Sequence, residues 1–116
     1  MGMNIFIKST DLELTEPLKT YINEKINALN KLFTHLDPDT VKVQIEVART
    51  SNHHRQGDVY RAEANMSLPH EVLRAEEENS DIRAAVDVVK DKLKREIESY
   101  LSRHGKDHRE GHSIEK

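Results

Sequence analysis

Residues 80–103 read SDIRAAVDVVKDKLKREIESYLSR, and this stretch decides which fold the rest of the sequence can adopt. Its apolar side chains recur at steps of four, three, four, four and three residues, the spacing of one face of an α-helix. These side chains are Ile82, Val86, Val89, Leu93, Ile97 and Tyr100. Ser80 is predicted to cap the start of the helix, and Gly105 lies just past its predicted end. The pattern predicts a long amphipathic helix that buries one face.

The polar side chains of this predicted helix fall into two strips. The first mixes carboxylates and cations at spacings suited to ion pairs: Arg83, Asp87, Lys90, Asp91, Lys94 and Glu98. The second carries cations and small residues but no carboxylate, although Glu96 flanks it: Ala84, Val88, Lys92, Arg95, Ser99 and Arg103. Either the second strip is a solvated helix face, or its unpaired cations form a ridge that faces phosphates.

The composition limits the fold and the chemistry. A chain of 116 residues is long enough for one domain with a single core. With 34% charged and only 4% aromatic residues, that core must be aliphatic. The net charge of −3 argues against indiscriminate binding of nucleic acid, so any RNA site must be a local patch. The absence of cysteine excludes disulfides, thiol nucleophiles and thiolate metal sites.

The remaining elements are predicted from periodicity and from turn residues. A helix starts at Thr15-Glu16-Pro17 and runs to about His35. Strands are predicted over residues 3–8, 41–49, 58–68 and 72 to about 77, with a polar loop over 50–57. The order β-α-β-β-β-α predicts an α+β two-layer sandwich, in which two helices pack on one face of a four-stranded sheet, like a double-stranded-RNA-binding domain. Residues 3–103 form this domain, and 104–116 are predicted to be a polar, disordered tail.

No catalytic group stands out in the sequence. It has no serine in a Gly-x-Ser-x-Gly turn and no glycine-rich phosphate loop. The acidic run Glu76-Glu77-Glu78 is either a solvated strand end or, if buried, an acid–base group, and its polar surroundings favour the solvated strand end. We therefore predict neither an enzyme nor a bound cofactor.

Two groups of histidines leave alternatives open. His104, His108 and His112 are spaced by four residues, but the intervening glycines favour a solvated tail over a metal site, so no metal is predicted. In the predicted loop, Arg49, His53, His54 and Arg55 are either plain loop polarity or a basic fingertip that contacts RNA.

RNA binding is the chemistry that remains. Lys25 lies at the shoulder of the apolar stripe of the first helix, where its stem can lie along the second helix and its ammonium can reach solvent. If the two helices lie side by side, Lys25 and the strip of Lys92, Arg95 and Arg103 border one groove. Such a surface suits the phosphates and 2′-hydroxyls of folded RNA rather than the base edges of DNA.

Several segments resemble a known family. Residues 73–78 (LRAEEE), 81–87 (DIRAAVD) and 91–97 (DKLKREI), together with MNI at 3–5 and the helix over 16–33, are similar to the ribosome hibernation promoting factors. These proteins are also called ribosome-associated inhibitors or sigma-54 modulation proteins. The resemblance covers residues 3 to about 103, with the same order of strands and helices.

The resemblance implies a function and a partner. Such proteins bind rRNA of the small ribosomal subunit in the channel for messenger and transfer RNA, and silence idle ribosomes in stationary phase or stress. Lys25, Lys92 and Arg95 match RNA-facing cations of the family, and Arg103 matches a basic position. The predicted RNA-binding set is Lys25, Arg83, Lys90, Lys92, Lys94, Arg95 and Arg103. We expect a soluble cytoplasmic protein of the short form, without membrane or DNA partners, and leave weak self-association open.

The sequence also departs from the family pattern. Arg83 stands where the family usually has tyrosine, and Glu96 replaces a common glutamine. Ser99 and Leu101 fall where cations are frequent, and the predicted loop is longer than in short members. The alternative function is a protein-interaction module that uses the exposed sheet face or an edge strand, without ribosome binding.

Overall fold

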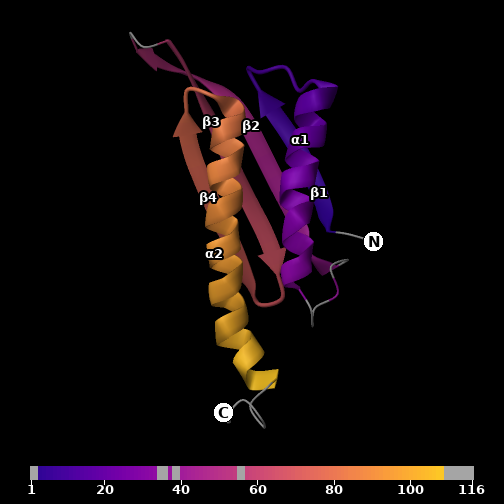
Figure 1. The fold of residues 1–116 in the computed structure, drawn as a ribbon. Helices are drawn as coiled ribbons and strands as arrows, with labels where there is room; N and C mark the ends of the chain where they lie inside the picture. Colours follow the sequence, from indigo (N-terminus) through magenta and orange to yellow (C-terminus); the bar gives the residue numbers. More distant parts are fainter. Residues whose placement is uncertain (1–2, 34–36, 38–39, 55–56, 109–116) are drawn as a thin grey trace.

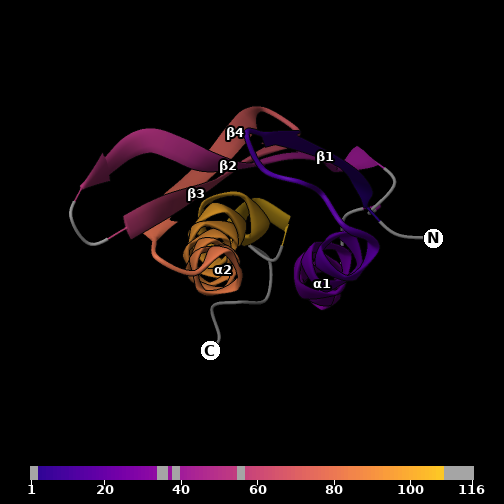
Figure 2. The same cartoon turned by 90° about the horizontal axis from the view of Figure 1, so that it is seen from above.

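The computed structural model describes residues 3–33, 37, 40–54 and 57–108, without the side chains of 51–54, 57, 58 and 105–108. Its elements are β1 (Asn4–Thr10), α1 (Glu16–Asn27), the 3₁₀ helix η1 (Ala28–Leu32), β2 (Lys42–His54), β3 (Gly57–Leu68), β4 (Glu71–Asn79) and α2 (Ile82–His108). Both long helices lie on the same face of the sheet (Figure 1), and the view from above separates the two layers (Figure 2). The predicted α+β class and element order are confirmed.

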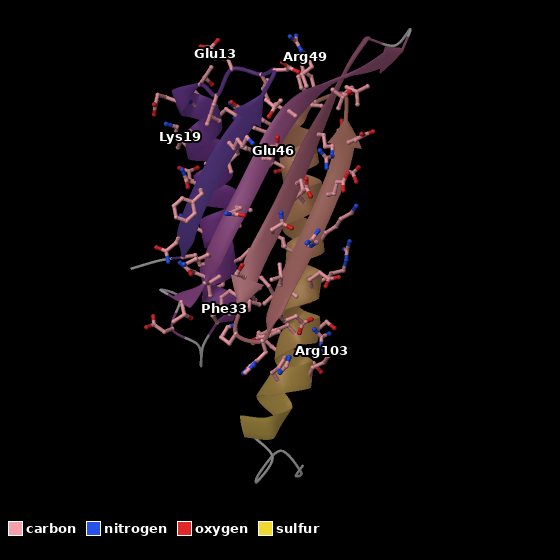
Figure 3. The ribbon with its side chains drawn as sticks, turned by 180° about the vertical axis from the view of Figure 1, so that it is seen from behind. Glu13, Lys19, Phe33, Glu46, Arg49 and Arg103 are labelled. Carbon is pink, nitrogen blue, oxygen red and sulfur yellow. The ribbon has the colours of Figure 1, made fainter. Side chains whose placement is uncertain are left out.

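The four strands lie in the order in which they occur in the chain. β1 pairs with β2 in parallel, whereas β2–β3 and β3–β4 are antiparallel. Parallel neighbours cannot be joined by a tight turn, and α1 fills the crossover between β1 and β2. The antiparallel strands need only short turns, one of which places His70 at φ 73°. The opposite face of the sheet carries no helix among the described residues (Figure 3).

An aliphatic core lies between the sheet and the helices. Alternate residues of β2 and β3 are buried, as predicted, and Ala62 and Ala64 are fully buried where α2 crosses the sheet. These small side chains let the helix approach closely. From α2 the core receives Ala85, Val86, Val89, Leu93, Ile97 and Tyr100. From α1 and η1 it receives Leu18, Ile22, Ile26 and Leu29.

The first helix is shorter than predicted. It ends at Asn27 and continues as a 3₁₀ helix to Leu32, rather than as an α-helix to about His35, a residue that lies outside the described part. Leu29 and Phe33 are buried despite the change of winding. Apolar spacing alone does not separate the two windings over a single turn, and 3₁₀ turns are common at helix ends. The predicted start is correct, because the Thr15 hydroxyl accepts a hydrogen bond from the Leu18 amide at 3.3 Å.

The second helix begins later and ends later than predicted. The carboxylate of Asp81, not Ser80, accepts a hydrogen bond from the Arg83 amide at 3.0 Å and thereby caps the helix. The helix then continues through Gly105 to His108, so the prediction that Gly105 ends it is wrong. Glycine lowers helix propensity by only about 1 kcal/mol, which tertiary contacts of the preceding turn can offset. His104 makes such a contact with Glu71 of β4. Of the predicted tail, residues 109–116 lie outside the described part.

The predicted loop over residues 50–57 is mostly strand. β2 continues to His54 and β3 starts at Gly57, with a register shift between Thr50 and His54. This end of the hairpin projects past β1 and β4 (Figure 1), which pair with Lys42–Ala48 of β2 and with Tyr60–Leu68 of β3. Backbone hydrogen bonds between β2 and β3 form this end of the hairpin, and no helix lies over it in Figure 1. Because neither of its faces is buried under a helix, it needs no alternation of apolar and polar residues, which is the pattern that predicts a half-buried strand.

The fold predicts a contrast between two valines of α2. Val86→Ala should lower the free energy of unfolding by about 1.5–3 kcal/mol, because its side chain is 1% exposed between helix and sheet. Val88→Ala, the same change two residues along the same helix, should shift it by less than about 0.5 kcal/mol, because Val88 is not part of the core. Urea unfolding followed by circular dichroism measures both. Equal losses would mean that α2 is rotated from the position described.

Candidate nucleic-acid interface

The first polar strip of α2 faces α1. Asp87 contacts Lys25 and Tyr21 of α1, which fixes the direction of this face. At 3.6 residues per turn, Lys90 lies about 60° and Lys94 about 20° around the helix from Asp87. Both lysines therefore lie on the side of α2 that faces α1, and we call this line between the two helices, which Lys25, Asp87, Lys90 and Lys94 border, the groove. Neither makes an ion pair with Asp87, Asp91 or any other residue in the described part of the chain, so the predicted intrahelical pairing is wrong.

Four side chains join the two helices at the start of this groove. The Tyr21 hydroxyl donates a hydrogen bond to Oδ1 of Asp87 at 2.6 Å, and Nζ of Lys25 lies 3.6 Å from the same oxygen. Nζ of Lys25 also lies 5.3 Å from the centre of the Tyr21 ring, and Cζ of Arg83 lies 4.7 Å from it. Both contacts lie within the range of cation–π attraction. The groove thus brings Lys25 and Arg83 together, although they are 58 residues apart in the sequence.

The ionisation of Tyr21 reflects this arrangement. Its hydrogen bond to Asp87 raises the pKa of the phenol to about 12, with partial burial and the negative charge of Asp87 acting in the same direction. Removing the phenol proton would break the hydrogen bond and place two negative charges side by side. The hydrogen bond therefore persists throughout the neutral pH range.

Two cations of the second strip, Lys92 and Arg103, are paired with carboxylates of another element, although the strip itself holds none. Lys92 donates to the main-chain oxygen of Glu76 at 2.8 Å and to the carboxylate of Glu77 at 3.1 Å. It lies about 140° around α2 from Asp87, on the side of β4 and away from Lys25. Arg103 is paired with Glu71 of β4. The expectation that Lys92 and Arg103 border the same groove as Lys25 is wrong, because it compared charges only within one helix.

The other predicted contacts divide as follows. Arg95 is exposed on the outer surface of α2 and makes no ion pair with any described residue. Arg49 lies in β2 and is exposed. His53 and His54 belong to the same strand rather than to a loop, and Arg55 lies outside the described residues. RNA contacts by these five residues stay a prediction.

Three functional neighbours escaped the sequence analysis. The sequence pattern does not mark Tyr21, and it places Asp87 in pairs within its own helix. Glu71 lies between the strands predicted over 58–68 and 72 to about 77, yet it pairs with Arg103 and lies 3.2 Å from Nε2 of His104. A tyrosine one helical turn before Lys25 and off the apolar stripe was the only available signal for the first contact.

Comparison with known proteins identifies the family. The family model described as sigma 54 modulation protein / S30EA ribosomal protein matches residues 5–104. The chain belongs to this family. It is 30% identical over 105 residues to a ribosome hibernation promotion factor of Deinococcus radiodurans, and 29% identical over 97 residues to that of Staphylococcus aureus. These matches cover 90% and 84% of this chain, but 52% and 47% of the relatives, so the chain spans about half their length.

Solved structures show the same S30EA fold. The N-terminal domain of Thermus thermophilus Protein Y matches with a TM-score of 0.70 and 24% identity, covering 84% of this chain and 99% of that domain. A ribosomal subunit interface protein from Coxiella burnetii matches with a TM-score of 0.68 and 18% identity, covering 86% and 99%. The family model and the two hibernation promotion factors confirm the predicted resemblance to the hibernation family.

The described part of this S30EA chain offers no metal centre and no membrane span. No three histidine, aspartate or glutamate side chains in that part are placed to share a metal ion. None of its helices has the length and the apolar character needed to cross a bilayer.

A cluster at the other end of α2 fixes the helix to the β3–β4 turn. Glu71 pairs with Arg103 and His104, and the Tyr100 hydroxyl donates to the main-chain oxygen of Pro69 at 3.0 Å. Figure 3 shows Arg103 beside the start of β4. The hydrogen bond from Arg103 holds the pKa of the Glu71 carboxyl below its usual value of 4.5.

This lowered pKa predicts a stability that depends on pH. A carboxylate whose pKa is depressed by folding stabilises the fold above its unfolded value and loses that effect as pH falls through the folded value. Glu71→Gln should therefore lower the melting temperature at about pH 7, and the difference from the native chain should shrink below about pH 4. Glu78→Gln, on the same strand and without an ion pair to a described residue, should change little at either pH. A constant difference at all pH values would contradict the ion-pair explanation.

Proposed function

We propose that this chain is a ribosome hibernation protein that binds rRNA of the small subunit in the channel for messenger and transfer RNA. Its body occupies the channel and excludes both ligands during stress or stationary phase. This mode of action is steric and needs no catalytic group. Family membership and the names of the relatives support a ribosomal partner.

The observation that carries the proposal is the set of unpaired cations on the groove side and the outer side of α2. Lys90, Lys94 and Arg95 make no ion pair with any described residue, and Lys25 and Arg83 lie at the same groove. These five cations outnumber the three carboxylates of the same helix strip, Asp87, Asp91 and Glu98, and so leave a local positive excess in a chain whose net charge is −3. Such a patch attracts a polyanion, although the whole molecule does not.

The side chains that border the groove favour contacts with the sugar-phosphate backbone of RNA over contacts with its bases. Lysine ammonium groups bind phosphates as point charges, and the one aromatic ring described there, Tyr21, already has Lys25 and Arg83 against it. The ring is therefore not a free platform for stacking a base. A pair of helices that carries cations on its exposed side suits the shape and the phosphates of folded RNA.

The ion pairs within the protein indicate which of the predicted cations should contribute most to phosphate binding. Lys92 and Arg103 donate hydrogen bonds to Glu77 and Glu71, which they must break before they can bind phosphate, so part of their interaction energy is offset. Lys25 differs, because its ammonium lies 3.6 Å from Asp87 without a hydrogen bond to it. The unpaired Lys90, Lys94 and Arg95 bring no such offset. We therefore place the main phosphate contacts on the groove side and the outer side of α2, and secondary ones on the β4 side.

The ranking predicts the effect of a double substitution. Lys90→Ala with Lys94→Ala should weaken cosedimentation with small ribosomal subunits and reduce the salt slope by about 0.7–0.9 for each phosphate that is no longer bound. The fold should be unaffected, because neither lysine makes an ion pair with a described residue. Sucrose gradients at several salt concentrations, with and without competing messenger RNA, provide the measurement.

Lys92→Ala is the matched control, since it removes one cation from the same helix. It should lower the melting temperature, because it removes the contacts of Lys92 with Glu76 and Glu77 of β4. It should weaken binding less than the double variant Lys90→Ala with Lys94→Ala. Native-like binding by the double variant, together with a strong decrease in Lys92→Ala, would contradict the ranking.

One observation favours the alternative function. On the open face of the sheet, Phe6 is 58% exposed at the rim of a depression of about 360 Å³. The depression is lined by Phe6, Ile7, Lys8, Gln44, Ile45, Glu46, Glu63 and Asn65. A protein partner on this face would bind with little dependence on salt, and binding would fall with Phe6→Ser but not with Lys90→Ala and Lys94→Ala.

A further inference from the structure

Asp87 is an acidic side chain within a cationic surface. A carboxylate beside Lys25, Arg83 and Lys90 lowers the local positive potential, so by charge alone it should weaken the binding of a polyanion. It is nevertheless the residue on which the contacts between α1 and α2 converge. Its Oδ1 accepts the hydrogen bond of Tyr21 at 2.6 Å and lies 3.6 Å from Nζ of Lys25.

The contacts of Tyr21 and Asp87 restrict two cations at once. Asp87 of α2 contacts the ammonium of Lys25 on α1. In the reverse direction, the centre of the Tyr21 ring of α1 lies 4.7 Å from Cζ of Arg83 on α2. The side chains of Lys25 and Asp87 remain 40% and 46% exposed, so a phosphate can still reach the ammonium. The arrangement orders the cations without burying them.

We infer that Asp87 and Tyr21 are positioning residues for RNA binding, which hold Lys25 and Arg83 in the groove between the helices. The inference rests on the proposed function and names residues of that site which do not themselves bind phosphate. Asp87 and Tyr21 act through the two cations.

Conformational entropy gives the physical reason. Ordering a free lysine or arginine side chain costs up to about 2 kcal/mol, and a phosphate that binds a mobile side chain must meet that cost. Side chains that are already restricted lose less freedom on binding. The gain outweighs the repulsion by Asp87 if the half-exposed carboxylate is well screened by solvent and salt.

The two possible roles of Asp87 predict opposite signs. If Asp87 only repels phosphate, Asp87→Asn removes a negative charge and tightens binding. If Asp87 positions Lys25, the same change weakens binding although the surface becomes more positive. Asparagine is close in shape and still accepts the Tyr21 hydrogen bond, so the comparison isolates the charge that holds Lys25.

Asp91→Asn is the matched control. Asp91 lies one turn further along α2, is exposed and makes no ion pair with a described residue. Both variants gain the same net charge. We expect Asp87→Asn to weaken binding to purified small subunits by about three- to tenfold, while Asp91→Asn leaves binding unchanged or tightens it by up to about twofold. Binding by Asp87→Asn that equals or exceeds that of Asp91→Asn would overturn the positioning role.

A double-mutant cycle separates positioning from a general loss of structure. In a Lys25→Ala background, Asp87→Asn should have a much smaller effect, because the side chain that it positions is gone. An undiminished effect would overturn the assignment. Tyr21→Phe keeps the ring and removes only the hydroxyl, and it should weaken binding less, with the same dependence on Lys25. It also serves as the test if Asp87→Asn lowers the melting temperature.

Titration of the phenol gives an independent signature. NMR of isotope-labelled tyrosine should show the pKa of Tyr21 falling in Asp87→Asn from about 12 toward its usual 10.0, because the charged acceptor is gone. An unchanged pKa would overturn the contact on which the inference rests. Failure of the native chain to bind small subunits at any salt concentration would instead overturn the proposed function, so the two failures are distinguishable.

Discussion

The burial of two apolar helix faces against one face of a four-stranded sheet is the constraint on which the rest of the molecule depends. It leaves α1 and α2 only one orientation, with their apolar stripes toward the sheet and their polar sides outward on the same surface (Figure 2). The small residues Ala62 and Ala64 let α2 lie close to the sheet. A single cationic surface then follows from packing, because side chains from two distant segments must share it.

Carboxylates of neighbouring elements decide which cations of that surface are available. Glu71 and Glu77 of β4 reach the near side of α2 and occupy Arg103 and Lys92. On the groove side, Lys90 and Lys94 make no ion pair with β4 or with any other described residue. The distribution of charge within one helix therefore does not predict which cations are paired, since ion pairs form with whichever partner is near in space. Asp87 illustrates the same rule, because it pairs with α1 instead of with its own helix.

The functional assignment combines two independent kinds of support. Family membership favours the ribosome as partner, and the local patch gives a physical means of holding a polyanion despite the net negative charge. The open sheet face carries a different surface, in which Arg61 pairs with Glu63 and Glu76 and only Phe6 and Val72 are large exposed apolar side chains in the described part. The two faces of the sheet are thus chemically distinct, and the cationic one is the one formed by the helices.

The sequence by itself determined the element order, the fold class and nearly all of the core, because period-two and period-3.6 patterns report burial directly. It located element ends less well, as in the early end of α1, the passage of α2 through Gly105 and the strand character of residues 50–54. There, backbone hydrogen bonds and contacts such as that of Glu71 with His104 override local propensity. Only the tertiary structure decided which cations are free and that Tyr21 and Asp87 join the helices. Those pairings depend on distances between segments that lie far apart along the chain, and no periodicity within one segment encodes them.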